Sequence, residues 1–215
     1  MSRAFLYFFG FFLENYDFIL QAKVFIYREV KKTLTAFVIY VIILLLPTKA
    51  KGDIMFRFDY LDKSLKDEYL PLLFDIMYCN MREITSNNLS YGEEKTEFIS
   101  EVSVALEKDP RKIILCYHGE ELAGFLMYYT RENMIMIEEL QIVKKYQRTR
   151  ALYSLCKYMI SCLPNHIEYI EAFSYKQNAT SIALQTWFGM EIIEETNEKL
   201  LHLRGNFSTF KNKIR

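Results

Sequence analysis

The sequence predicts an α/β domain with a mixed sheet, of the α+β kind, and three observations lead to this fold class. Apolar residues make up 51% of the 215 residues, which is enough for one domain with a substantial core. Residues 112–143 contain three strand-like runs separated by turns, as in an antiparallel meander. Residues 137–190 then read as strand, turn, helix, strand and helix. We therefore expect one domain with an appended segment.

The composition excludes several classes of protein. Lysine plus arginine and aspartate plus glutamate number 27 each, so no global basic field favours nucleic acid. The four cysteines form no C-x-x-C pair and have no histidine at a metal-ligand spacing. We therefore predict no nucleic-acid partner, no metal site and no disulfide framework. A cytoplasmic location fits this cysteine usage best.

Residues 1–54 are expected to form a hydrophobic extension that is separate from the domain at residues 55–215. Its two apolar runs, Ala4–Leu13 and Thr35–Leu46, are shorter than the ~20 residues that span a membrane. One interpretation is a genuine membrane-associated leader, so that membrane contact is possible only through this segment. The other is a misassigned start. If Lys51-Gly52-Asp53 is encoded by AAA-GGA-GAT, a purine-rich ribosome-binding sequence precedes Met55.

The domain is expected to begin with one strand and two helices. Phe56–Leu61 has the pattern of a short strand. Apolar residues at helical spacing predict a helix from Leu65 to Arg82, with Pro71 near its first turn, where proline is tolerated. After a polar loop, a second helix is expected from about Glu94 to Glu107, because Asp109-Pro110 stops it.

The rest of the domain is expected to consist of a meander followed by alternating helices and strands. A hairpin and a third strand of the same meander are predicted at Lys112–Tyr117, Leu122–Tyr129 and Met134–Val143. The elements predicted after it are helix Ala151–Cys162, strand Glu168–Ser174, helix Thr180–Phe188 and strand Glu198–Leu203. The basic turn at 144–150 would point free backbone N–H groups at an anion over the helix N-terminus.

Two segments in this order resemble the GNAT superfamily of N-acetyltransferases, over roughly residues 56–204. The strand end Leu140-Gln141-Ile142 is followed by Tyr146-Gln147-Arg148, which looks like the start of the family's Q/R-x-x-G-x-G/A loop. Asn178–Leu184 with Gly189-Met190 is similar to the family's N-x-x-A-x-x-L-Y…G-F segment. The resemblance implies a GNAT-like acyl-CoA N-acyltransferase fold. It also implies acetyl-CoA as co-substrate, lying beside a splayed strand.

The same resemblance implies which residues would bind acetyl-CoA. The strand backbone would pair with the pantetheine arm, the loop would hold the pyrophosphate, and one asparagine would contact the cofactor or cap a helix. These residues are Gln141, Ile142, Val143, Gln147, Arg148, Thr149, Arg150, Ala151, Leu152 and Asn178. Where the family has two glycines, this chain has Arg150 and Leu152, whose side chains would narrow or displace the site. Arg148 and Arg150 either compensate by contacting phosphates directly or are solvated.

The resemblance also identifies a candidate for the proton donor. In many family members a tyrosine follows the leucine of the second segment and protonates the departing CoA thiolate. This chain has Gln185 there, and an amide is not an acid but can hydrogen-bond a thiolate. Tyr153 and Tyr175 are spare phenols near this position in the sequence.

Two glutamates on the strand that flanks the acetyl group, Glu138 and Glu139, are candidates for the general base. Strand alternation places Glu138 on the side of Leu140 and Ile142, and it directs Glu139 to the cleft. Glu139 is therefore the preferred base. The alternative is that either glutamate is only a solvated residue at an exposed edge.

The function that this pattern favours is acetyl-CoA-dependent transfer of an acetyl group to a primary amine of a small molecule or peptide. The rival interpretation keeps the fold but makes the chain a catalytically silent domain, which binds a ligand or a protein. The altered loop and Gln185 are the features that favour the rival. Neither the acceptor nor the oligomeric state is predicted, because acceptor pockets are built from variable segments.

Overall fold

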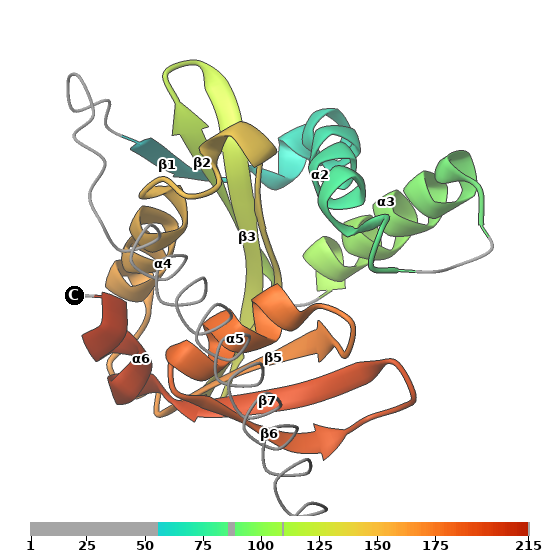
Figure 1. Ribbon diagram of the computed structural model, residues 1–215. Helices are drawn as coiled ribbons and strands as arrows, with labels where there is room; N and C mark the ends of the chain where they lie inside the picture. Colours follow the sequence, from blue (N-terminus) through green and yellow to red (C-terminus); the bar gives the residue numbers. More distant parts are fainter. Residues whose placement is uncertain (1–55, 86–88, 109, 215) are drawn as a thin grey trace, which may run out of the picture. The chain divides into compact units, whose positions relative to one another are not determined.

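A computed structural model describes residues 56–85, 89–108 and 110–214, and the extension expected at residues 1–54 lies outside this part. One seven-stranded sheet organises it, in the order β1-β2-β3-β4-β5-β7-β6 (Figure 1). Neighbouring strands are antiparallel except for β4 and β5, which are parallel, so the predicted mixed sheet is confirmed. The strands are β1 (Phe56–Tyr60), β2 (Lys112–His118), β3 (Glu121–Arg131), β4 (Met134–Ile142), β5 (Tyr169–Tyr175), β6 (Met190–Glu195) and β7 (Leu200–Asn206).

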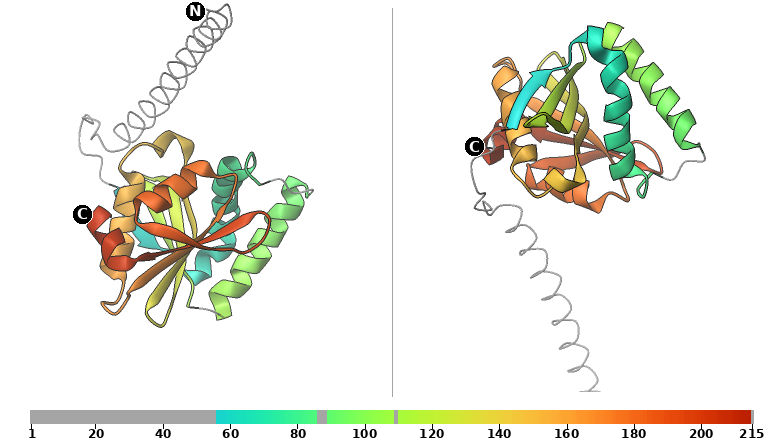
Figure 2. Two further views of the ribbon diagram at one scale, coloured as in Figure 1. Left: turned by 60° about the horizontal axis from the view of Figure 1, so that its bottom comes forward. Right: turned by 90° about the horizontal axis from the view of Figure 1, so that it is seen from above.

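Helices cover the two faces of the sheet in separate layers. The α-helices are α2 (Lys66–Met81), α3 (Tyr91–Lys108), α4 (Ala151–Cys162), α5 (Ala179–Trp187) and α6 (Phe207–Ile214). The two views of Figure 2 show α2 and α3 together on one side of the sheet, and α4 and α6 on the other. Short 3₁₀ turns precede α2 and α4, at Lys63–Leu65 and Lys144–Tyr146.

Each layer buries its own apolar core against the sheet. On the α4 side, Leu155, Met159 and Phe210 pack against Leu126 and are at most 2% exposed. On the α2 side, buried leucines of α2 and α3 pack against three residues of β2 and β3. These residues are Leu70, Leu73, Leu106, Ile113, Phe125 and Met127. A sheet with two covered faces supplies the rigid frame on which a site can be built.

The predicted elements are confirmed, with differences of a few residues at their ends. The largest such differences are three residues each: α3 starts at Tyr91 and not at Glu94, and β7 ends at Asn206 and not at Leu203. Ser90 and Glu93 form a reciprocal capping box, in which each backbone N–H donates to the other residue's side chain. Pro71 lies in the second turn of α2 and not in its first, because the helix begins at Lys66.

Two elements were not expected from the sequence. Strand β6 lies at the sheet edge, and only its first residue, Met190, is buried, so it lacks the alternation of a half-buried strand. Helix α6 has just eight residues, but Phe207, Phe210 and Ile214 are buried at helical spacing. Its start is fixed by Asn206, whose side chain accepts hydrogen bonds from the Ser208 amide and hydroxyl.

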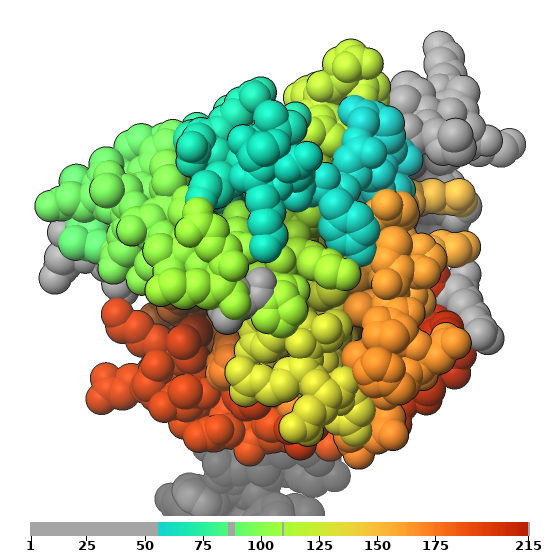
Figure 3. All heavy atoms as spheres, turned by 180° about the vertical axis from the view of Figure 1, so that it is seen from behind, coloured from blue at the N-terminus to red at the C-terminus, as the bar shows by residue number. Residues whose placement is uncertain are grey.

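The parallel strands β4 and β5 pair along only part of their length. Their pairing runs from Met134–Tyr169 to Ile137–Ala172, and β4 then continues for five residues beside β3 alone. The backbone edge of β4 beyond Ile137 is therefore open toward β5. Figure 3 shows the α2–α3 side of the molecule, with the C-terminal strands emerging beneath α3. Within the described ranges, no helix is both long enough and apolar enough to cross a membrane.

Candidate active site

The opening between β4 and β5 brings together several of the residues that the sequence indicated, among them Glu139, Gln141, Ile142 and Gln147. A β-bulge shapes it: Met127 of β3 pairs with Glu139 and Tyr128 pairs with Ile137, which leaves Glu138 as the extra residue. Paired residues of antiparallel strands share a face, so Glu139 lies on the α2 side with Met127. The expectation that Glu139 faces away from the side of Leu140 and Ile142 agrees with this register.

The bulge corrects the expected position of Glu138. Alternation placed it with Leu140 and Ile142, which pack in the core on the α4 side. Its carboxylate instead forms a two-point ion pair with Arg111, whose guanidinium lies 5.8 Å from the centre of the Tyr129 ring. A regular strand would have kept the alternation, whereas an inserted residue breaks it. Glu138 is thus already neutralised by a partner.

Glu139 is partly buried and accepts a hydrogen bond of 2.8 Å from the side-chain amide of Gln141. Burial raises the pKa of its carboxyl from 4.5 to about 7, the Gln141 hydrogen bond acts in the opposite direction, and the nearby charge of Glu138 adds to the increase. A carboxyl with a pKa near neutrality exchanges protons readily at physiological pH, as a general base must.

Tyr175 faces the same opening from the end of β5. Burial raises the pKa of its phenol first, and the carboxylates of Glu139 and Glu94 raise it further. Glu94 comes from the first turn of α3, so three separate elements contribute to this group of side chains. A phenol with a raised pKa stays protonated at neutral pH, and its O–H is therefore a hydrogen-bond donor.

The end of β4 is engaged by side-chain amides. The carbonyl oxygen of Ile142 accepts hydrogen bonds of 3.0 Å from both Asn80 of α2 and Gln147 of the loop. The amide of Val143 donates to Ala123 of β3, so it is used within the sheet. The side chain of Gln141 is 7% exposed and accepts from Asn80 at 3.0 Å. Sequence reasoning missed Asn80, since an asparagine in the last turn of a helix belongs to no motif.

The loop between β4 and α4 has an unusual backbone. Arg148 adopts a positive φ of 65°, a backbone conformation that residues other than glycine seldom take. The Ala151 amide donates to the Thr149 hydroxyl at 3.1 Å, and Ala151 itself is fully buried. Arg150 is exposed at the N-cap of α4, whereas Leu152 packs against the core on the α4 side. The two residues at the family's glycine positions therefore point in different directions.

Helix α5 supplies two further side chains that the sequence singled out. Asn178 caps the helix, because its side chain accepts from the Ser181 amide at 3.0 Å. It also contacts the sulfur of Met81 at 3.9 Å. Gln185 donates to the Ser181 hydroxyl at 3.0 Å, while its amide oxygen is buried and without a partner in the part of the chain that the structure describes. Such an oxygen is an acceptor for a ligand donor.

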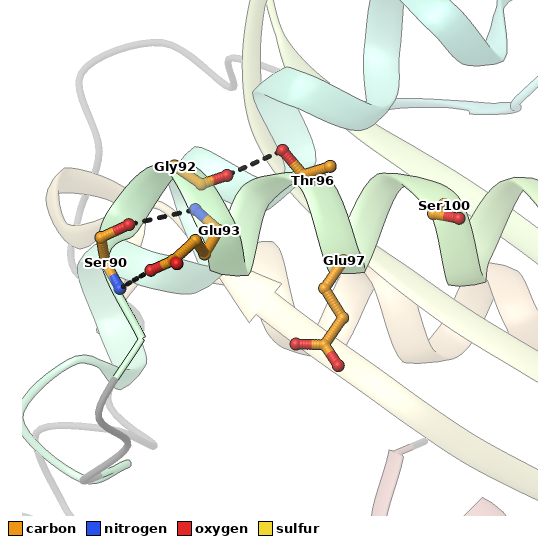
Figure 4. A pocket seen from close by; sticks show the side chains of 6 residues that line it. All are labelled: Ser90, Gly92, Glu93, Thr96, Glu97 and Ser100. Atoms are coloured by element: carbon orange, nitrogen blue, oxygen red, sulfur yellow. Dashed lines mark hydrogen bonds between the residues drawn. The ribbon is translucent and has the colours of Figure 1, made fainter.

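Two surface hollows lie away from this opening. One is lined by a single face of α3, where Ser90 and Glu93 satisfy one another (Figure 4). The other, of about 280 Å³, lies between β1, the start of α2 and β2, and includes Tyr69 and Tyr117. The carboxyls with shifted pKa values in these hollows, Glu93 and Asp62, have lowered pKa values, whereas the pKa of Glu139 at the β4–β5 opening is raised toward neutrality.

A central mixed sheet, a helix pair after the first strand, and a fourth strand that separates from the fifth are the features of the GNAT-type N-acetyltransferase fold. The structure aligns with the PaiA N-acetyltransferase of Thermoplasma acidophilum in complex with coenzyme A, with a TM-score of 0.57, 12% identity, and coverage of 71% of this chain and 99% of that one. An acetyltransferase of Thermus thermophilus aligns with a TM-score of 0.58, 16% identity, and coverage of 71% and 98%.

A third solved structure, the ribosomal-protein-S18-alanine N-acetyltransferase of Escherichia coli, aligns with a TM-score of 0.51 at 14% identity, over 71% of this chain and 94% of that one. No family model and no curated protein matches the sequence. At these identities the likeness establishes the fold, and the GNAT-like fold expected from the sequence is confirmed.

Proposed function

We propose that the chain is an acetyl-CoA-dependent N-acetyltransferase that moves an acetyl group to a primary amine of a small molecule or peptide. The observation that carries this proposal is Glu139, a carboxyl with a pKa of about 7 at the β4–β5 opening of a GNAT-type fold. In this proposal the catalytic domain is residues 55–215.

Glu139 acts as the general base. An amine is protonated at neutral pH and must lose a proton before it is a nucleophile. The carboxylate takes that proton, and the neutral nitrogen attacks the thioester carbonyl carbon. The C–N bond forms as the C–S bond breaks, the nitrogen loses its second proton, and the thiolate takes up a proton and leaves as the CoA thiol. Because a thiol has a pKa of ~8.5, a hydrogen bond to the departing thiolate is sufficient help.

Tyr175 and Gln185 are the two candidate donors to that thiolate. The Tyr175 phenol shares the opening with Glu139, and its raised pKa keeps the proton on the oxygen. The Gln185 amide nitrogen keeps one N–H after its bond to Ser181, and the buried Gln185 oxygen has an open acceptor position for an N–H of a ligand. Acetyl-CoA carries amide groups in its pantetheine arm that fit such an acceptor.

The test is a transfer assay with the full-length chain, acetyl-CoA and a panel of amines that includes small diamines and lysine-containing peptides. We expect acetylated product by mass spectrometry and an equal amount of free CoA thiol. Glu139→Gln should lower kcat/KM about 10²–10⁴-fold, the usual contribution of a general base. The proposal fails if the wild-type chain binds acetyl-CoA and acetylates none of the amines.

The rival function is a catalytically silent GNAT-fold domain that binds a ligand or a protein. The observation that favours it is the Ile142 carbonyl, which faces the opening and already has two amide donors of the chain, Asn80 and Gln147. If the chain is silent, acetyl-CoA and free CoA leave the thermal midpoint unchanged, and the amine panel stays unmodified.

A further inference from the structure

Four polar side chains form a continuous row of hydrogen bonds along the open edge of β4. Gln147 of the loop donates to the Asn80 side-chain oxygen at 3.2 Å. Asn80 donates to the Gln141 side-chain oxygen at 3.0 Å, and Gln141 donates to the Glu139 carboxylate at 2.8 Å. The row therefore joins the candidate cofactor loop to the candidate base, through one residue of α2.

Two acceptors, the Ile142 carbonyl and the Glu139 carboxylate, determine how the side-chain amides in this row are oriented. A backbone carbonyl and an ionised carboxylate only accept hydrogen bonds. Asn80 must therefore turn its NH₂ group toward the Ile142 carbonyl, and Gln141 must turn its own NH₂ group toward Glu139. The Gln141 oxygen then faces Asn80, whose NH₂ group satisfies it. If the Asn80 donor is removed, the buried side-chain oxygen of Gln141 has no hydrogen-bond partner. The Gln141 amide is then no longer fixed in the orientation that donates to Glu139.

We propose that Asn80 is a positioning residue of the acyl-transfer site, which holds Gln141 in the orientation that donates to Glu139 and ties this pair to Gln147 of the loop. The inference rests on the proposed function, because it assigns Asn80 a role through the proposed base. In this proposal Asn80 contacts neither the acceptor amine nor the thioester. It acts from the last turn of α2, so the helix layer on this side of the sheet takes part in the chemistry.

Among the described residues, Glu138 and Tyr175 are the titratable groups that interact electrostatically with Glu139. Glu138, on the same strand, is paired with Arg111. Tyr175 of β5 is within electrostatic reach of Glu139, and its raised pKa keeps the phenol neutral at neutral pH in the wild type and in an Asn80 variant. A change in the protonation of Glu139 after substitution of Asn80 therefore reports the loss of the Gln141 donor.

The experiment compares Asn80→Ala and Asn80→Asp with the wild-type full-length chain. The pH midpoint of kcat/KM should move upward by at least about half a unit in Asn80→Ala, because a carboxylate that loses a donor binds protons more readily. Asn80→Asp should move it further, since its carboxylate cannot donate and adds a negative charge. Cys79→Asp is the matched control: it places the same charge one residue away on the exposed side of α2 and should leave the midpoint unchanged.

A second measurement keeps the test independent of activity. The side-chain carboxyl carbon of Glu139, observed by NMR in selectively labelled chain, should titrate near pH 7 in the wild type and at higher pH in both Asn80 variants. Folded Asn80→Ala with an unchanged titration overturns the inference. If the wild type transfers no acetyl group, the proposed function fails, but the titration still decides whether Asn80 controls Glu139.

Discussion

At the scale of single residues, Glu139 is subject to opposing influences on its proton affinity. Burial raises its pKa, the Gln141 amide lowers it, and Glu138 contributes less than an isolated carboxylate would, since Arg111 neutralises it. The result is a folded-state pKa of about 7 against 4.5 in the unfolded chain. Glu139, the proposed base, therefore lowers the free energy of unfolding when its carboxyl is ionised.

This effect of Glu139 predicts how stability depends on pH. Because the folded-state pKa is the higher one, the folded chain binds more protons between pH 4.5 and 7, and stability falls as the pH rises through this range. At pH 8 the ionised carboxylate lowers the free energy of unfolding by up to about 3 kcal/mol. Glu139→Gln should therefore be more stable than the wild type at pH 8, and the difference should shrink toward pH 5.

Thermal unfolding at pH 5, 6, 7 and 8 measures this effect. Glu198→Gln is the control, because it removes a carboxyl from an exposed turn. A gain in stability that is equal at pH 5 and pH 8 would contradict the raised pKa of Glu139.

The position of a residue in the site could be predicted only where a local sequence pattern determines it. The face of the sheet on which Glu139 lies was predicted correctly, because alternation along a strand holds from Glu139 to Ile142. The position of Glu138 was predicted wrongly, because no residue type in the sequence indicates the bulge. The bulge arises from the pairing of β3 with β4. Asn80 and Arg111 were missed, since each meets its partner across a long sequence separation.

At the scale of secondary-structure elements, the close approach of β3 and β4 positions the open edge of the site. A Cβ atom on Gly124 would lie 2.8 Å from the Ile142 Cδ1 atom and 3.1 Å from its Cα atom. Glycine at this position lets the β4 backbone reach its place, where Ile142 presents its carbonyl to the opening. The same reason makes the position sensitive to substitution.

Gly124→Ala should destabilise the chain by about 1–3 kcal/mol, because the added methyl group has to displace the β4 backbone. Gly92→Ala is the matched control: nothing lies within 4 Å of its added Cβ, and alanine in a helix should leave stability unchanged or raise it by up to about 1 kcal/mol. Urea unfolding of both variants measures the difference. Equal free energies of unfolding would show that β3 and β4 accommodate a side chain at Gly124.

The loop before α4 gives a second prediction at this scale. Arg150 is exposed at the N-cap, where glycine is tolerated nearly as well as a capping residue. Arg150→Gly should bind coenzyme A about threefold or more tightly than Arg150→Ala, because only glycine removes the Cβ beside the backbone that approaches a pyrophosphate. Both variants lack the charge, so isothermal titration of the pair isolates the backbone effect. Equal dissociation constants would mean that the loop is no weakened pyrophosphate site.

The elements that the sequence revealed are those with a strong period or a clear stop. The helix Ala151–Cys162 was predicted to the residue, because its buried positions Leu155, Cys156 and Met159 repeat at helical spacing. The start of α3 could have been read from the Ser90–Glu93 capping box. Strand β6 could not, because five of its six residues are exposed and its pairing with β7 is what makes it a strand.

At the scale of the whole domain, the proposed function draws on residues from both sides of the sheet. Asn80 belongs to the α2–α3 layer, and Gln147 belongs to the loop before α4. Both donate to the Ile142 carbonyl, at the β4–β5 opening where the sheet separates. Element order made this arrangement predictable from the sequence, but the contacts between layers were not, since they depend on helix packing.

A ligand held by both layers should stabilise the domain as a unit, and this gives the last prediction. At a hundredfold excess over its dissociation constant, acetyl-CoA adds ~2.7 kcal/mol to the free energy of unfolding. For a domain of this size, that is a rise in the thermal midpoint of roughly 5–10 °C. The full-length chain should show this rise with acetyl-CoA and with CoA. Gly124→Ala should show a smaller one, because it moves the strand edge that would receive the pantetheine arm in the proposed function. Sodium phosphate at the same ionic strength is the control for nonspecific anion binding. If millimolar acetyl-CoA leaves the thermal midpoint unchanged, the hydrogen bonds from Asn80 and Gln147 to the Ile142 carbonyl exclude the ligand. The chain would then be a catalytically silent domain with this fold.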